Sequence, residues 1–227
     1  MKKTFYTEWA YLAGIAILAA GTAFMERADF GVSMVVAPAY LLYLKISTYL
    51  PFFTFGMAEY TLQAVIIAAM MIVLRKFKLS YLFSFVTAVI YGLLLDASML
   101  LAAMLPDTTF AYRMVYYIVG MLCCSLGVSL LFHTYISPEA YELFVKEMSA
   151  KLHMDINRFK TLYDCASCAV AIVLSFSFFG LWHFEGVKLG TIVCALINGT
   201  LIGRITKLLE SVFDFKDGLS WHKYFEA

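Results

Sequence analysis

Six ionisable side chains gather in or beside the outer halves of the long apolar segments of this sequence, where a charge is poorly solvated. They are Glu26, Arg27, Asp29, Glu59, Asp96 and Arg113. An ionisable group at the centre of a membrane helix costs roughly 2.5–3.5 kcal/mol, so each of these residues requires a structural or functional reason. The four carboxyl groups could bind a cationic or zwitterionic solute, or they could carry protons.

Asp96 has the deepest expected position among these residues. It lies about nine residues inside its apolar segment, or ~13 Å at a rise of ~1.5 Å per residue. Glu59 lies about seven residues inside the preceding segment, or ~10 Å. Asp96 is therefore our first candidate for direct contact with a solute or a proton. The structural alternative is that the acids pair inside the bundle, for example Arg113 with Asp96 or Glu59, and a ligand could replace one partner.

A short segment at residues 30–46 interrupts the pattern of long apolar runs. Gly31 and Pro38 break regular backbone there, and non-helical backbone at membrane depth is tolerated only inside protein or beside a polar cavity. The free backbone groups, together with the hydroxyls of Ser33 and Tyr40, could contact a ligand, as broken segments do in many transporters. The alternative is an amphipathic plug that caps the bundle.

A second pair of charges is expected near the opposite face. Asp164 lies near the start of the fifth long apolar run, and Arg204 lies near the end of the sixth. Antiparallel neighbours would bring the two side chains to a similar depth, so we predict a structural salt bridge that locks the two helices together. A gating role for the same pair is the alternative.

The elements that must position these residues are membrane helices. Hydrophobic residues make up 63% of the 227 residues and charged residues 15%, with a mean hydropathy of +0.82, whereas a soluble domain is ~45–50% apolar and ~25% charged. This composition excludes a soluble enzyme or nucleic-acid-binding protein. Runs of ~20 apolar residues can cross a bilayer. They cover roughly 9–25, 52–74, 81–105, 112–133, 162–184 and 187–209. We predict an all-α polytopic membrane protein with about six transmembrane helices in a single transmembrane domain, residues 1–227.

The distribution of basic residues indicates the orientation. If residues 30–46 return to the side from which they came, few of the 17 Lys and Arg residues lie outside. The outside residues are then Arg27, Lys45, Arg113 and Lys188. Because cytoplasmic loops carry an excess of Lys and Arg, we predict a re-entrant or interfacial segment at 30–46. Both termini would then be cytoplasmic, with the bundle in a bacterial inner membrane.

One loop has the pattern of a separate helix, at residues 137–153. Ser137 suits a helix cap, Pro138 suits a first helical position, and Glu139 suits the positive end of a helix dipole. Apolar residues then recur at helical spacing opposite charged residues. We predict a cytoplasmic amphipathic helix that lies on the membrane or on a partner protein, with packing on its own bundle as the alternative.

Small residues at four-residue spacing mark close helix contacts in two of the spans. The first span has Ala16 with Ala20 and Ala19 with Ala23, and the last span has Gly199 with Gly203. These stripes indicate packing within the bundle. The alternative is that they form a homodimer or bind a partner membrane subunit.

No pattern in the sequence indicates an enzyme, a cofactor or a metal. The phosphate-binding loop of ATPases, the zinc motif of metalloproteases and the nucleophile elbow of hydrolases are all missing. The four histidines lack metal-ligand spacing, and Cys165 and Cys168 lie in an apolar helix without the context of a redox motif. We expect no catalytic residue, metal, cofactor or nucleic acid partner. Uphill transport would require an ion gradient or a separate ATPase.

Several short strings are distributed over nearly the whole chain. They lie at residues 28–33, 91–96, 137–144, 159–164, 189–192 and 198–199. In this order they resemble the bacterial YczE/YitT-like integral membrane proteins, although Met34 follows Ser33 where that family suggests a proline. The resemblance implies a membrane bundle and a permease. The general plan is also similar to the substrate-binding subunits of energy-coupling-factor vitamin transporters, which have a long gating loop after the first span.

The sequence therefore predicts a membrane transporter, or the substrate-binding membrane subunit of one, for a small cationic or zwitterionic solute. The predicted binding residues are Asp96, Glu59, Asp29, Glu26, Arg113, Gly31, Ser33 and Tyr40. The expected partners are the lipid bilayer and the solute. The alternative is a non-transporting scaffold or regulator that acts on a partner protein through the amphipathic helix and the small-residue stripes.

Overall fold

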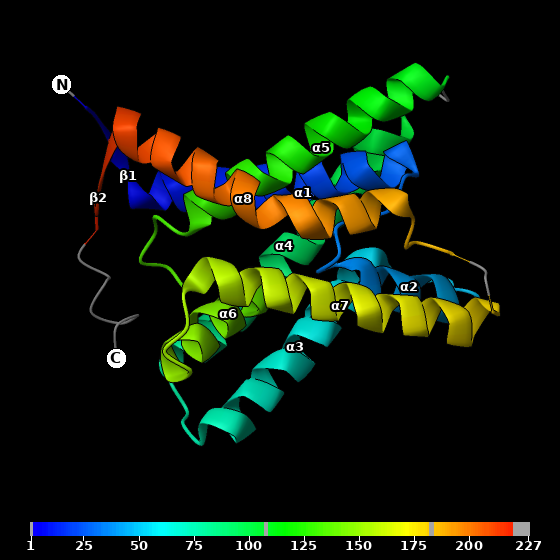
Figure 1. The fold of residues 1–227 in the computed structure, drawn as a ribbon, viewed down its shortest axis with the longest axis horizontal. Coiled ribbons are helices and arrows are strands. Elements are labelled where there is room, and N and C mark those ends of the chain that lie inside the picture. The colour runs from blue at the N-terminus through cyan, green and yellow to red at the C-terminus, as the bar shows by residue number, and fades with distance from the viewer. Residues whose placement is uncertain (1, 107–108, 182–183, 220–227) are drawn as a thin grey trace.

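The computed structural model describes residues 2–106, 109–181 and 184–219. Within these residues the chain forms eight helices and two short strands (Figure 1). The long helices are α1 (Thr7–Ala28), α3 (Phe55–Leu74), α4 (Leu79–Ala103), α5 (Phe110–Leu131), α7 (Ile156–Phe179) and α8 (Leu189–Val212). The short elements are β1 (Lys3–Tyr6), α2 (Ala37–Ile46), α6 (Ala140–Lys151) and β2 (Phe213–Lys216).

Six of these helices are long and apolar enough to cross a membrane, which confirms the predicted all-α membrane fold. A helix suits a bilayer because it bonds all of its backbone polar groups within one segment. Large apolar side chains such as Ile72, Leu101 and Leu189 are exposed on the helices, as contact with lipid requires. The chain is therefore an integral membrane protein.

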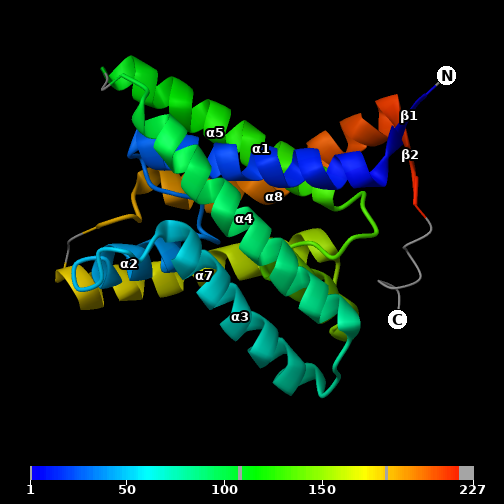
Figure 2. The same ribbon diagram turned by 180° about the vertical axis from the view of Figure 1, so that it is seen from behind.

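The two ends of the described chain lie together on one face of the bundle. β1 and β2 form a parallel pair in which Lys3 lies opposite Phe213. Glu8, near the start of α1, also accepts hydrogen bonds from the backbone N–H groups of Gly218 and Leu219. We call this the terminal face. The opposite face, where α1 ends and α5 and α8 begin, is the distal face (Figure 1, Figure 2).

The most extensive helix contact joins α1 and α5, which run antiparallel. Gly14 of α1 faces Gly127 of α5, and Gly21 faces Gly120. A Cβ atom at Gly21 would lie 2.8 Å from the Gly120 carbonyl oxygen, too close for any side chain. In each helix the two glycines lie two turns apart on one side, so the backbones approach closely along the whole contact.

The small-residue stripes expected from the sequence differ in their role inside the bundle. In α1, Ala19 and Ala23 are buried, whereas Ala16 is exposed and Ala20 is half-buried. In α8, a Cβ atom at Gly199 would lie 3.1 Å from the Thr161 hydroxyl of α7, whereas one at Gly203 would meet nothing within 4 Å. Gly199 therefore contributes to internal packing, and a partner subunit at these stripes stays a prediction.

Residues 30–46 do not cross the membrane. α2 has ten residues, which corresponds to ~15 Å of helix, about half of a ~30 Å hydrocarbon core. The chain before α2 is buried below the distal face, where the Thr191 hydroxyl donates a hydrogen bond to the Val32 carbonyl at 2.8 Å. At the end of α2, Lys45 Nζ donates to the carbonyl of Phe178 at the distal end of α7. The segment enters and leaves at the same face, so it is re-entrant.

α6 packs on its own bundle, beside α7 (Figure 1). Its side chains Tyr141 and Val145 are buried, and the helix contacts α3, α4 and α7. The helix starts at Ala140 rather than at Ser137. The reason is that the preceding segment is inserted between helices, where the Ser137 carbonyl accepts a hydrogen bond from the Thr87 hydroxyl of α4 at 2.9 Å.

Candidate functional site

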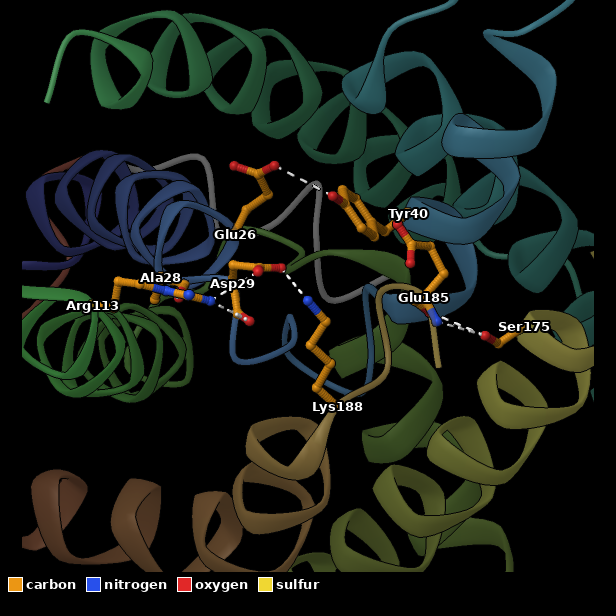
Figure 3. Close-up of polar contacts among 8 residues, drawn as sticks. All are labelled: Glu26, Ala28, Asp29, Tyr40, Arg113, Ser175, Glu185 and Lys188. Atoms are coloured by element: carbon orange, nitrogen blue, oxygen red, sulfur yellow. Dashed lines mark hydrogen bonds and ion pairs between the residues drawn. The ribbon is translucent and has the colours of Figure 1, made fainter. Parts of the chain in front are cut away.

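The predicted site residues near the distal face form a network of ion pairs around Asp29 (Figure 3). Asp29 follows α1 in the left-handed backbone conformation, with φ of 55°. Its Oδ2 lies 2.8 Å from Arg113 Nη2, and its Oδ1 pairs with Lys188 Nζ. Arg113 Nε also donates to the Ala28 carbonyl at 2.8 Å. This distal network ties together the end of α1 and the beginnings of α5 and α8.

Glu26 and Tyr40 extend the distal network toward α2 (Figure 3). The Tyr40 hydroxyl donates to Glu26 Oε1 at 3.3 Å, and burial beside this acid raises the pKa of the Tyr40 phenol. The cavity beside them is about 30 Å³, the space of about one water molecule. Gly31 leaves no room for a Cβ atom against Thr191, and Ser33 is buried. The distal network itself therefore leaves no space for a solute.

Asp96 holds the beginning of α3 and does not join the distal network. Its Oδ1 accepts a hydrogen bond from the backbone N–H of Gly56, and its Oδ2 accepts one from the Thr54 hydroxyl, both at 2.8 Å. A pocket of about 320 Å³ lies beside it, with Tyr43 and Met99 in its walls. Both carboxylate oxygens of Asp96 are thus already used to hold a helix end.

Glu59 lies in a different, fully buried place. Its side chain is 0% exposed, and its Oε2 accepts a hydrogen bond from the Tyr141 hydroxyl of α6 at 2.9 Å. Gln63, one turn further along α3, donates from Nε2 to Glu59 Oε2 at 3.4 Å and to Glu139 Oε2 at 3.1 Å. The predicted binding residues therefore divide among three places: the distal network, the start of α3 and this buried position.

Glu59 belongs to a buried group of four acids and one lysine, which we call the carboxylate cluster. Its members are Glu59, Glu139, Glu142, Lys160 and Asp164, each at most 5% exposed. Lys160 Nζ lies 2.9 Å from Glu142 Oε1 and 3.2 Å from Asp164 Oδ1. One lysine thus pairs with two of the acids. Glu59 and Glu139 have no basic partner among the ion pairs of the described residues.

Several oxygens of the carboxylate cluster have no hydrogen-bond donor. In the described part of the chain these include Glu59 Oε1, Glu139 Oε1 and Glu142 Oε2, all shielded from solvent. Burial raises the pKa of Glu139 well above its ordinary value, and the neighbouring carboxyl groups of Glu59 and Glu142 raise it further. The cluster is therefore short of positive charge, and a bound cation or proton would satisfy it.

A cavity of about 450 Å³ leads from the terminal face to the carboxylate cluster. Glu142 and Pro138 line one side of it, and Ile202, Gly203 and Thr206 of α8 line another. Apolar side chains such as Leu131 and Ile156 line much of the remainder, together with four charged or titratable side chains. These four are His133, Lys146, Lys207 and Glu210. The volume is that of a site for a small organic molecule.

Asp164 pairs with Lys160, and the predicted salt bridge to Arg204 is not among those of the described residues. Lys160 lies one turn before Asp164 on the same face of α7. Side chains at this spacing are neighbours, so the two opposite charges can pair within the helix. The Arg204 side chain of α8 is exposed. Asp164 therefore links α7 to α6, through the shared Lys160–Glu142 pair, and not to α8.

Glu139, Glu142 and Lys160 were not predicted as site residues. The helix at 137–153 was expected to lie on the membrane, on a partner or on its own bundle, and its charged side was expected to face water. One usable indication was present, because Lys160 and Asp164 stand one turn apart at the beginning of an apolar span. Charges in a membrane helix require partners inside the protein, and the nearest unassigned acids were those after residue 137.

Comparison with protein families matches residues 5–207 to a family of unknown function, DUF6198. The match extends from β1 through most of α8. The chain belongs to the DUF6198 family. Comparison with curated proteins gave no match, and comparison with solved structures gave none. The distal network and the carboxylate cluster of this DUF6198 protein both lie inside the matched residues.

The carboxylate cluster of the DUF6198 protein does not have the geometry of a metal site. Among the described residues, no three His, Cys, Asp or Glu side chains converge closely enough to hold a metal ion. A zinc site normally has at least three such ligands.

Proposed function

We propose that this DUF6198 protein is a membrane transporter for a small cationic or zwitterionic solute, which enters through the terminal-face cavity. The observation that carries the proposal is the position of Glu142. This side chain lines the cavity of about 450 Å³, and its Oε1 holds Lys160. Its Oε2 is buried without a partner in the described part of the chain. A cationic group that reaches this carboxylate from the cavity would supply the missing partner.

The distal network is packed much more tightly than the terminal-face cavity, as one gate of an alternating-access transporter would be. The cavity at the terminal face is about 450 Å³, whereas the space within the distal network is about 30 Å³. Asp29, Arg113 and Lys188 tie together the end of α1 and the beginnings of α5 and α8. Ion pairs of this exposed kind typically contribute ~0–1 kcal/mol each, so this network can open reversibly.

The charges around the cavity support a solute with groups of both signs. Lys146 and Lys207 line the same space as Glu142. An amine on the solute would contact Glu142, and a carboxylate on the same solute would contact a lysine. A simple cation would use the first contact alone. Both possibilities lie within the proposed solute class.

The resemblance to the YczE/YitT-like permeases and the distribution of basic residues support a cellular setting. The terminal face carries the larger share of Lys and Arg, and it would therefore be cytoplasmic in a bacterial inner membrane. Because the sequence has no ATP-binding loop, the protein would use an ion gradient, or it would serve as the substrate-binding subunit beside a separate ATPase.

The alternative role, a scaffold that binds a partner through α6, has less support. Phe144 of α6 packs against Phe159 and Tyr163 of α7, with ring centroids 6.4 Å and 5.4 Å apart. Tyr141 and Val145 are also buried. The apolar side that a partner protein would need is therefore largely occupied by the bundle itself.

Thermal unfolding of the purified full chain with choline, putrescine, lysine and glycine betaine tests the transporter proposal. A solute at ~100 times its Kd stabilises the folded state by about 2.7 kcal/mol. We expect at least one of the four to raise the melting temperature of the wild type and of Glu147→Gln, and to have no effect on Glu142→Gln. Glu147 is a matched control because it lies on the same helix and pairs with Lys78 at 3.1 Å.

Two outcomes would overturn this proposal. One is an equal rise in melting temperature for the wild type and Glu142→Gln, which would place the solute elsewhere. The other is the absence of any response to all four compounds, together with no uptake of them into vesicles that contain the wild-type protein.

A further inference from the structure

Gln63 bridges two buried acids from different parts of the chain. Its Nε2 lies 3.1 Å from Glu139 Oε2 and 3.4 Å from Glu59 Oε2. Its Oε1 accepts a hydrogen bond from the backbone N–H of Ala140 at 3.0 Å. This last bond decides the orientation of the amide, because only the carbonyl oxygen can accept from an N–H. The two carboxyl groups therefore share one amide nitrogen as their donor.

Neither of these acids has enough donors to remain ionised beside the other. Glu59 is 0% exposed and Glu139 is 3% exposed. The donors that reach them are the Gln63 amide and the Tyr141 hydroxyl, and both bond to Oε2 atoms. Each acid retains an Oε1 atom without a partner among the described residues. Two carboxylates at close range in a region of low dielectric do not both ionise unless a cation joins them.

We propose that Glu59 and Glu139 form a proton-binding pair that holds one exchangeable proton at neutral pH. The proton resides on one of the two unpartnered Oε1 atoms, and the pair carries a single negative charge. If the protein is the transporter proposed above, on which this second step rests, the pair is its coupling site. Solute movement would then be driven by a proton gradient.

The other titratable groups around the pair are already neutral or already paired, so the exchangeable proton is expected on the pair itself. Tyr141 and Glu142 face it from α6, Tyr91 from α4, Tyr11 from α1, Cys124 from α5 and Lys160 from α7. Lys160 is already paired with Glu142 and Asp164. The tyrosines and the cysteine are neutral near pH 7. The raised pKa of Glu139 agrees with a carboxyl group that retains its proton.

The pair also has a route to water. Glu142 neighbours Glu139 in the carboxylate cluster and lines the terminal-face cavity. A proton released from the Glu139 carboxyl group can pass to the Glu142 carboxylate and then to water in the cavity, which restores the starting ionisation of Glu142. The transfer needs no oxidant or second reactant, because only one O–H bond breaks and one forms at each step.

Infrared spectroscopy of the full chain in lipid at pH 7 tests the pair directly, since a protonated carboxyl group has a C=O stretching band separate from that of carboxylates. We expect this band in the wild type, shifted in D2O and lost above the pH at which the pair ionises. Glu59→Gln and Glu139→Gln should each remove the band entirely, because the neutral amide takes the place of the protonated partner. Glu147→Gln, which removes an acid paired with Lys78, should leave the band unchanged.

Three spectroscopic outcomes would overturn the proton-binding pair. A wild-type protein without the band would have both acids ionised, and a band that sodium chloride removes would indicate that the pair binds sodium ions instead. A band that each single variant halves would indicate two independent protons. The first two outcomes are read from the wild-type protein alone, so they decide the proposal even if a variant fails to fold.

A transport experiment separates this inference from the proposed function. Vesicles containing the protein are given a pH gradient and then choline or lysine, and accumulation is measured. We expect accumulation in the wild type, with Glu59→Gln and Glu139→Gln showing only equilibration. Solute transport that does not depend on the pH gradient would overturn the coupling role, and the proposed transport function would still stand. If neither solute moves, the proposed function loses its support, whereas the infrared band still decides the proton-binding pair.

Discussion

The carboxylate of Asp96 in α4 accepts a hydrogen bond from the backbone N–H of Gly56 at 2.8 Å, and so closes the first turn of α3. Thr54 completes this cap, because its hydroxyl donates to Asp96 and accepts from the backbone N–H of Met57. α3 follows the re-entrant segment, so its first N–H groups lie where water is scarce. A helix start in such a place requires acceptors from the protein.

Replacement of Asp96 should therefore reduce stability more than it affects solute binding. Loss of a helix cap costs about 0.5–2 kcal/mol, and we expect Asp96→Ala to lower the free energy of unfolding by an amount in this range. Asp96→Asn retains one acceptor and should have a smaller effect. Thermal unfolding in detergent measures both, with Asp214→Asn as a surface control whose partner is Lys216. An Asp96→Ala protein of unchanged stability that no longer binds solute would restore Asp96 as a ligand residue.

The glycines between α1 and α5 provide a second prediction. A Cβ atom at Gly21 would lie 2.7 Å from the backbone nitrogen of Cys124, so Gly21→Ala must push two helices apart. Overpacking of this kind costs typically ~1–3 kcal/mol. Gly203→Ala is the matched control, because nothing lies within 4 Å of the added carbon. It should be neutral, or stabilising by up to ~1 kcal/mol. Equal effects of the two changes on the melting temperature would contradict the close approach of α1 and α5.

Lys160 should be essential for folding because of its two acid partners. Lys160→Met would leave Glu142 and Asp164 buried without a cation, and a broken buried pair costs about 3–5 kcal/mol. A triple variant that adds Glu142→Gln and Asp164→Asn removes the uncompensated charges. We expect the single variant to express poorly or melt early, and the triple variant to regain most of the lost stability. Failure of the triple variant to recover would show that Lys160 acts by packing and not by charge.

The raised pKa of Glu139 predicts how stability depends on pH. The unfolded chain has an ordinary glutamate with a pKa of ~4.3, whereas burial beside two other acids raises the pKa of Glu139 in the folded state. The folded state therefore retains the proton more strongly. The stability from this group is fully present below the unfolded pKa, and it is lost as the pH rises through the folded pKa.

Glu139→Gln should remove this pH dependence, because glutamine stays neutral. We expect the stability of the variant relative to the wild type to increase as the pH is raised from ~4.3 into the alkaline range. Melting temperatures measured at several pH values for both proteins check this. A difference that stays constant over the whole range, or that shrinks as the pH rises, would mean that the folded protein does not retain the proton.

Much of the architecture follows from sequence alone. The long apolar runs define six membrane helices, and the short run with Pro38 together with the distribution of Lys and Arg identifies the re-entrant segment. The helix that follows Glu139 is also evident from the spacing of its apolar residues. These inferences succeed because each depends on neighbours along the chain: a span is defined by its length, and a helix by the period of its side chains.

Only the tertiary structure shows which charged side chains contact one another. The sequence marked Glu59 and Asp96 as unusual, yet it could not show that Glu59 faces the inserted start of α6 while Asp96 caps α3. It paired Asp164 with Arg204, because it could not tell which face of α7 is turned toward α6. In a membrane protein both lipid and protein surroundings are apolar, so the apolar pattern of a helix says little about which side faces its neighbours. The partners of a buried charge depend on helix rotation and on where a loop is inserted, and both are set by contacts between residues far apart in the chain.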